Sequence, residues 1–165
     1  MKRLVQRDDG VWDFVPYFAY LETIRAQLPA HVHAFAVDED NYNFSSPSSL
    51  HDAGLKSLII RELQGDDGRR TSVAVETTYL GPEGDVDIHI AYGGVVGYDL
   101  HYAQVRPETH GYGGSPIHGD VIAHEIRIDR PGVFTHEVFF ADGAGFTIHF
   151  TDFAHRVAPI PPSRP

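Results

Sequence analysis

The chain of 165 residues contains no cysteine, which excludes a disulfide framework and any zinc site built from thiolates. No apolar stretch approaches the roughly 18 residues that a membrane span needs. Residues 1–10 are charged and polar and lack the apolar core of a signal peptide. We therefore expect a cytoplasmic protein that does not enter a membrane.

Basic residues are also scarce. The chain has 13 Lys and Arg against 23 Asp and Glu, which gives a formal net charge of −10 at pH 7. An acidic domain is repelled by phosphate backbones and attracted to basic surfaces, so we expect a basic protein partner and no nucleic acid. The alternative interpretation is that the acidity only keeps the protein soluble. The oligomeric state is left open.

Two segments near the N-terminus have helical patterns. Apolar residues recur at three-and-four spacing over residues 13–28, with Asp13 placed to cap the helix and Pro29 just beyond its end. Residues 30–37 fit either a short helix or a short strand, and we favour the helix. Residues 38–49 are rich in Asp, Asn and Ser, which predicts a loop.

From residue 50 onward the apolar residues follow the period of two that is typical of strands. The predicted strands cover residues 55–63, 71–80, 86–92, 95–102, 121–129, 133–140 and 146–153. Tight turns between them indicate antiparallel neighbours. The sequence therefore predicts a single α+β domain over residues 1–157, with an N-terminal helix packed on a mainly antiparallel sheet of about seven strands. The prolines in residues 158–165 predict an extended tail.

Two repeated His-Glu pairs allow a more specific prediction. His124-Glu125 and His136-Glu137 lie on adjacent predicted strands, and both histidines share a face with apolar residues. Pairing of these strands sets Glu125 opposite Glu137, with Arg127 further along the same row to offset the two like charges. We expect buried histidines and solvent-exposed glutamates. A general acid–base pair of carboxylates is the alternative, but it needs a pocket.

Eleven histidines raise the question of a metal site. The helical spacing His-Glu-x-x-His is absent, and His31 and His33 would share a face only if their segment were a strand. We therefore predict no cofactor and assign no metal ligand.

The longest irregular stretch after the helical region is residues 106–120. It combines His110, Tyr112 and His118 with glycines, and loops of more than about 12 residues are often functional. Aromatic side chains give a large contact area at a small cost in entropy. We predict that His110, Tyr112 and His118 contribute to binding.

Residues 50–57 read Leu-His-Asp-Ala-Gly-Leu-Lys-Ser. This segment resembles a group of uncharacterised small bacterial proteins that carry a Leu-His-Asp-Ser-Trp-Leu-like motif between an N-terminal helical region and a β-rich half. The spacing of Tyr92, Val95 and Tyr98 and the ending over residues 136–153 also fit that plan. The resemblance implies a stand-alone bacterial protein, and some similar folds act as immunity proteins against toxins.

The His51-Asp52 pair within this motif has two interpretations. The aspartate can bond to backbone amides two residues on and hold Gly54 in a special conformation, or the pair can be half of an acid–base site. We favour the turn and predict His51 and Asp52 as further binding residues. The leading hypothesis is a non-enzymatic, immunity-like interaction protein. The alternatives are a metal-dependent or acid–base enzyme, or a small-ligand binder with a pocket between helix and sheet.

Overall fold

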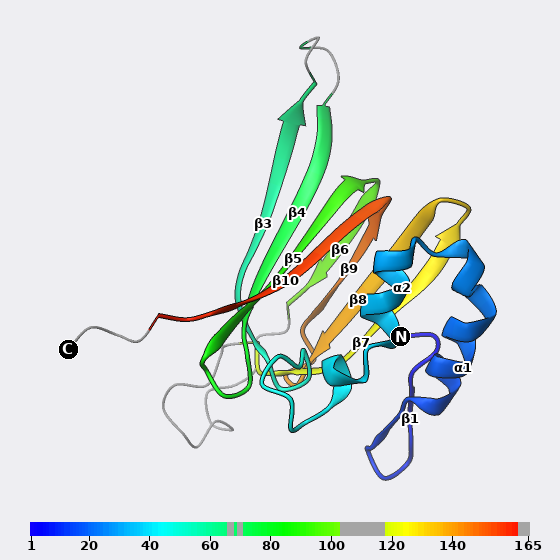
Figure 1. The fold of residues 1–165 in the computed structure, drawn as a ribbon, viewed down its shortest axis with the longest axis vertical. Coiled ribbons are helices and arrows are strands. Elements are labelled where there is room, and N and C mark those ends of the chain that lie inside the picture. The colour runs from blue at the N-terminus through cyan, green and yellow to red at the C-terminus, as the bar shows by residue number, and fades with distance from the viewer. Residues whose placement is uncertain (66–67, 69–70, 103–117, 162–165) are drawn as a thin grey trace.

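The computed structural model describes residues 1–65, 68, 71–102 and 118–161. Within these residues ten strands form three antiparallel sheets, and two α-helices precede the two larger sheets along the chain (Figure 1). The elements are β1 (Val5–Gln6), β2 (Trp12–Asp13), α1 (Val15–Ile24), η1 (Arg25–Gln27), α2 (Ala30–Val37), η2 (Glu39–Tyr42), β3 (Gly54–Gln64), β4 (Thr71–Leu80), β5 (Val86–Val95), β6 (Gly97–His101), β7 (Val121–Arg130), β8 (Val133–Phe140), β9 (Gly145–Phe150) and β10 (Asp152–Pro159). The predicted α+β class and the antiparallel pairing are confirmed. The strands do not form one sheet of about seven, however.

No helix in these residues is long and apolar enough to cross a membrane.

Both predicted helices are present. α1 begins one residue after its N-cap, Phe14, while Asp13 lies outside the helix and accepts a hydrogen bond from the backbone N–H of Val15 at 3.0 Å. The short α2 covers the segment that fitted either a helix or a strand. Its buried face includes Phe35, and that of α1 includes Tyr17. The two helices therefore bury one apolar side each.

Two four-stranded sheets carry most of the chain, in the orders β10-β5-β4-β3 and β6-β9-β8-β7. β5 leads into β6 and β9 leads into β10, so one two-stranded ribbon belongs to both sheets (Figure 1). Gly94 allows this passage because its φ is +54° and an added Cβ would lie 2.0 Å from Oγ1 of Thr151. The strand predicted over residues 146–153 is therefore two strands that meet at Thr151. β10 also takes up the first two residues of the predicted tail.

The core joins the inner faces of both sheets to the helices. Its largest fully buried side chains are Tyr17, Tyr79, Tyr92, Phe140, Phe150, Leu21, Leu50, Ile88, Ile90, Ile126, Ile148 and His124. The β3–β4 hairpin extends beyond the neighbouring strands (Figure 1). Its outer half therefore packs against little of this core, and residues 59–64 of β3 are exposed.

The register predicted for the β7–β8 hairpin is confirmed. Glu125 lies opposite Glu137, and His124 and His136 are 1% and 0% exposed. The predicted exposure of the glutamates is wrong, because Glu125 is 0% exposed and Glu137 is half-buried. The N-terminal segment folds over this face, and Arg127 pairs with both carboxylates.

Candidate binding site

The His51-Asp52 pair forms a tight turn just before β3. Asp52 has a φ of +65°, the one positive φ among the described residues other than glycine. Aspartate tolerates this left-handed conformation better than most residues. The predicted turn is present, but its special conformation lies at Asp52 and not at Gly54, which begins β3, and among the described residues no backbone N–H donates to the Asp52 carboxylate. The Asp52 N–H donates to the carbonyl of Val121 at 2.8 Å and fastens the turn to β7.

The His51 ring is held in place by its surroundings. It is 8% exposed and lies 4.1 Å from the ring centre of Phe44. Its Nδ1 is 3.0 Å from Oδ1 of Asp52, although the two are not aligned as a hydrogen bond. Among the described residues, no hydroxyl group hydrogen-bonds to this ring; the Ser49 hydroxyl accepts from the His51 backbone N–H at 3.0 Å instead, so the ring activates no nucleophile in this arrangement.

Three carboxylates gather around this turn. Burial, followed by the nearby charges of Asp52 and Asp142, raises the pKa of Asp120, and His51 partly opposes the effect. The backbone confirms their proximity, because Gly54 pairs with Asp120, whose carbonyl accepts from the N–H of Ala141 at 2.9 Å. The three side chains therefore form a locally negative rim, which we call the acidic rim.

An apolar groove of about 190 Å³ begins beside the acidic rim. It is lined by Leu55, Leu58, Leu100, His101, Tyr102, His118, Phe140, Ala144, Gly145 and Phe146. These residues come from β3, from β6 and the residue after it, from His118 shortly before β7, and from the end of β8, the start of β9 and the turn between them, which also carries Asp142. Leu100 and Tyr102 are 49% and 54% exposed, so the groove opens to solvent.

The structure brings together three of the five binding residues predicted from the sequence. His51 and Asp52 lie at the acidic rim, and His118 lines the groove with its ring 5.1 Å from Tyr102. His110 and Tyr112 lie outside the described residues. The sequence analysis missed Asp120 and the apolar lining. The alternation of Tyr98, Leu100 and Tyr102 with polar residues was the available signal for part of that lining.

A chain of buried polar side chains runs through the core behind this region. The Tyr92 hydroxyl lies 2.7 Å from Nδ1 of His136, whose Nε2 is 3.2 Å from Nδ1 of His124. Nε2 of His124 lies 3.4 Å from the carbonyl oxygen of Asn41. A carbonyl can only accept, so with both imidazoles neutral each donor in the chain is fixed: His124 donates to Asn41, His136 to His124, and Tyr92 to His136.

Burial favours the neutral form of both histidines in this chain. Burial lowers the pKa of His124 to about 3, despite the opposing hydrogen bond to Asn41. Burial and the neighbouring His124 also lower the pKa of His136 well below its ordinary value. The chain is a satisfied core network, as predicted for these histidines. Among the described residues, no three His, Asp or Glu side chains are placed to hold a metal ion.

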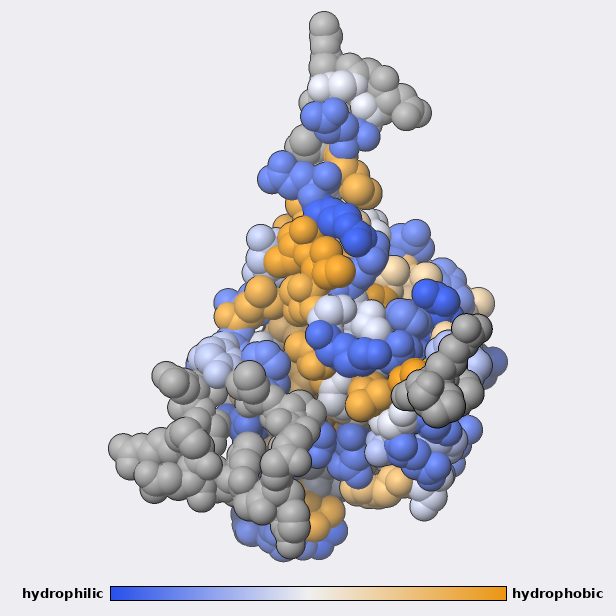
Figure 2. Space-filling view, turned by 90° about the vertical axis from the view of Figure 1, so that its left-hand side faces the viewer, coloured by the Kyte–Doolittle hydropathy of each residue, from blue (hydrophilic) through white to orange (hydrophobic). Residues whose placement is uncertain are grey.

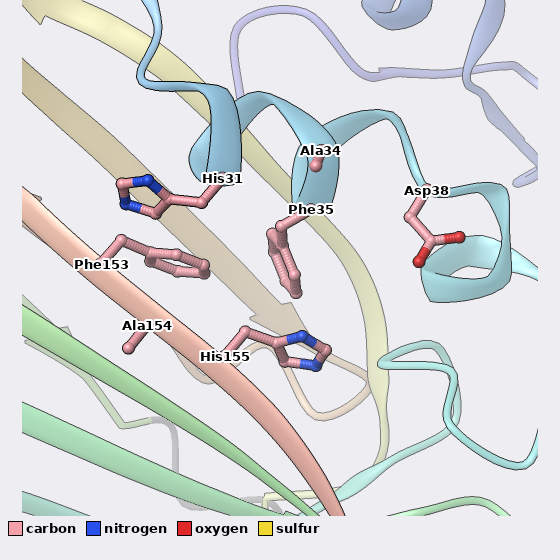
Figure 3. Close-up of a pocket in the computed structure, with 7 residues that line it drawn as sticks. All are labelled: His31, Ala34, Phe35, Asp38, Phe153, Ala154 and His155. Carbon is pink, nitrogen blue, oxygen red and sulfur yellow. The ribbon is translucent and has the colours of Figure 1, made fainter.

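A second hollow of about 480 Å³ lies between α2 and β10 (Figure 3). His31, Phe35 and Asp38 approach it from the helix side, and Phe153 and His155 approach it from the strand. The Phe35 ring is 4.9 Å from Phe153 and 4.8 Å from His155. Burial lowers the pKa of His155, and the charge of Asp38 opposes this. We call this hollow the histidine cleft.

No protein-family model matches the chain, and none of the curated proteins or solved structures compared with it matches either.

Proposed function

We propose that this protein is a non-enzymatic interaction protein of the bacterial cytoplasm that binds a basic polypeptide at the apolar groove. The observation that carries the proposal is that the acidic rim adjoins this groove: Asp120 and Asp142 lie two positions from the lining residues His118 and Ala144, and Asp120 pairs with Gly54 beside Leu55. With about 190 Å³, the groove is smaller than the roughly 300–1,000 Å³ typical of small-molecule pockets. It suits an apolar side chain of a partner, with basic groups of that partner over the rim.

The charge of the whole molecule supports the same partner. A formal charge of −10 attracts a basic polypeptide over about one Debye length and repels nucleic acid. An immunity-type role, in which the basic partner is a toxin, is the form of this function implied by the resemblance over residues 50–57. The alternative enzyme hypothesis relies on the His51-Asp52 pair, and among the described residues no hydroxyl group is hydrogen-bonded to the His51 ring, since Ser49 Oγ accepts from the His51 backbone N–H instead.

Neutralising the acidic rim is expected to weaken binding of a basic peptide. The probe is a blocked peptide of about eight residues that alternates lysine and valine. The variant Asp52→Asn/Asp120→Asn should bind it about tenfold more weakly, because each exposed charge pair contributes about 0.2–1 kcal/mol. The association rate of the parent should fall as ionic strength rises from about 0.01 to about 0.15 M, which shortens the Debye length from about 30 to about 8 Å.

The matched control is Asp8→Asn/Glu22→Gln, which removes two exposed charges elsewhere and gives the same formal charge of −8, that is −10 plus two. This control should keep the affinity within about twofold of the parent. Equal losses in the two variants would show that only net charge acts, and the proposed site would be wrong.

The size and lining of the histidine cleft favour a second candidate function, binding of a small ligand. About 480 Å³ is within the range of small-molecule sites, and two aromatic rings with two imidazoles and a carboxylate offer both stacking and polar contacts (Figure 3). Aromatic fragments should shift the amide resonances of Phe153 and His155 in NMR titrations. Ala34→Trp, which fills the cleft, should abolish those shifts. Fragments that leave the parent's resonances unchanged would exclude this candidate.

A further inference from the structure

The fold covers two of its sheet edges with specific side chains. At the β7 edge, the hydroxyl of Tyr17 accepts from the N–H of Ile126 at 2.7 Å, and that of Tyr20 accepts from the N–H of Ile128 at 3.1 Å. At the β10 edge, α2 packs through Phe35 on Phe153 and His155 near the start of the strand, while in the part of the chain that the structure describes residues 156–159 pair only with β5. The β7 edge is thereby protected from pairing with another chain, and the start of the β10 edge is screened by α2.

Within the described residues, the β3 edge is blocked only near the start of the strand. Near its start it pairs with Asp120 through Gly54 and has a bulge between Leu55 and Ser57, where Lys56 forms an ion pair with Asp87. Bulges and lysines are devices that discourage strand pairing. Beyond the bulge, among the described residues, no element pairs with β3 on the side away from β4.

Apolar side chains are exposed on both faces of this open part of β3. Ile59 and Leu63 are 39% and 46% exposed on one face, and Ile60 is 36% exposed on the other, which is the face of the groove residue Leu58. Seen from the side of β3, an apolar band runs down from the protruding hairpin (Figure 2). A long, exposed apolar edge is a ready template for an additional strand.

The charges on the molecule decide between two occupants of this edge. A second copy would bring another formal charge of −10 against this one, so edge-to-edge pairing of two copies is opposed by repulsion. A basic strand is attracted instead, and the acidic rim lies at the start of β3. Of the other described edges with no strand beside them, β6 is five residues long and contributes Leu100 to the groove, and the uncovered end of β10 is only four residues long.

We propose that the open edge of β3 takes up an extended segment of the basic partner by strand addition, so that the sheet gains a strand beside β3. The inference rests on the proposed function and specifies how the partner binds. Side chains of an added strand alternate between the two faces, so every second residue would lie beside Leu58 and Ile60 on the groove side. The segment recognised is therefore one that alternates apolar and basic residues.

The test is amide hydrogen exchange of the full chain, measured by NMR with and without the alternating lysine–valine peptide. At about ten times the dissociation constant, exchange at every second amide between Ser57 and Gln64 should slow about tenfold, because those N–H groups gain partners. The amides between them already pair with β4 and should change little. Protection confined to β6 or β10, or no alternation along β3, would overturn strand addition.

A matched peptide separates this inference from the proposed function. Methylating every backbone nitrogen of the probe keeps its side chains and charge but removes its hydrogen-bond donors. The methylated peptide should bind at least ~10-fold more weakly, since several backbone hydrogen bonds are lost. Equal binding of both peptides, still weakened by Asp52→Asn/Asp120→Asn, would overturn strand addition and leave the proposed function standing. Peptide binding that is not weakened by those substitutions would overturn both strand addition and the proposed function.

Discussion

Replacing Glu125 by alanine is expected to lower the free energy of unfolding by about 3–5 kcal/mol. The carboxylate is fully buried and accepts hydrogen bonds from the backbone N–H groups of Lys2, Arg3 and Leu4 at 2.6, 2.9 and 2.9 Å. It also accepts from Nε of Arg127 at 3.1 Å. Its removal would leave the largely buried Arg127 guanidinium with one carboxylate partner instead of two, and three backbone N–H groups without an acceptor. Removing one partner of a buried ion pair is strongly destabilising because the remaining groups stay buried without their partner.

Glu137→Gln is the matched control for this prediction. Glu137 also pairs with Arg127, at 2.9 Å, but its side chain is 23% exposed, so water can replace part of what is lost. The expected cost is about 1 kcal/mol. Urea unfolding followed by circular dichroism measures both changes. A cost below about 1 kcal/mol for Glu125→Ala would mean that the N-terminal segment is not anchored on this carboxylate.

Acidification should destabilise the protein strongly between pH 7 and pH 5. Folding lowers the pKa of His124 to about 3 and also lowers that of His136, so below the unfolded value of about 6.5 the unfolded chain binds more protons than the folded one. The stability is therefore present above about pH 6.5 and is lost as the pH falls. By pH 5 each histidine lowers the free energy of unfolding by about 2 kcal/mol, so the two together lower it by about 4 kcal/mol.

His124→Gln tests the assignment of this loss to the buried chain. The variant removes one of the two buried imidazoles, so the destabilisation between pH 7 and pH 5 should fall by about half. His155, whose pKa is also lowered, acts in the same direction and remains in the variant. Urea unfolding at pH 5, 6 and 7 measures how the free energy of unfolding of each protein changes with pH. A parent whose stability does not change over this interval would contradict the neutral, buried chain.

Local patterns were enough to predict much of this fold. Period two located most of the strands, and placing His124 and His136 on apolar faces fixed both their burial and the β7–β8 register. These predictions succeed because alternation determines which face of a strand meets the core. Failures occurred where distant segments meet. The burial of Glu125 depends on residues 2–4, more than 100 positions away, and no local signal links them.

The passage of the chain between the two sheets was equally hidden from local patterns. The sequence around Thr151 does not predict a turn, yet the chain bends there and passes from one sheet to the other. Part of the candidate site was predicted from the sequence. Turn chemistry and loop length pointed to His51, Asp52 and His118, and the fold places them at the acidic rim and in the adjoining groove. The groove depends on residues of β3, β6 and the adjoining ends of β8 and β9, which come together only in the folded chain.

The central claim is that a basic polypeptide binds in the groove beside the acidic rim. NMR mapping of the isotope-labelled chain with the alternating lysine–valine peptide at low salt tests this most directly. The account predicts saturable shifts at Leu58, Leu100, His118 and Asp120 that are weakened by Asp52→Asn/Asp120→Asn but not by Asp8→Asn/Glu22→Gln. Shifts spread evenly over the acidic surface, or confined to the histidine cleft, would contradict it.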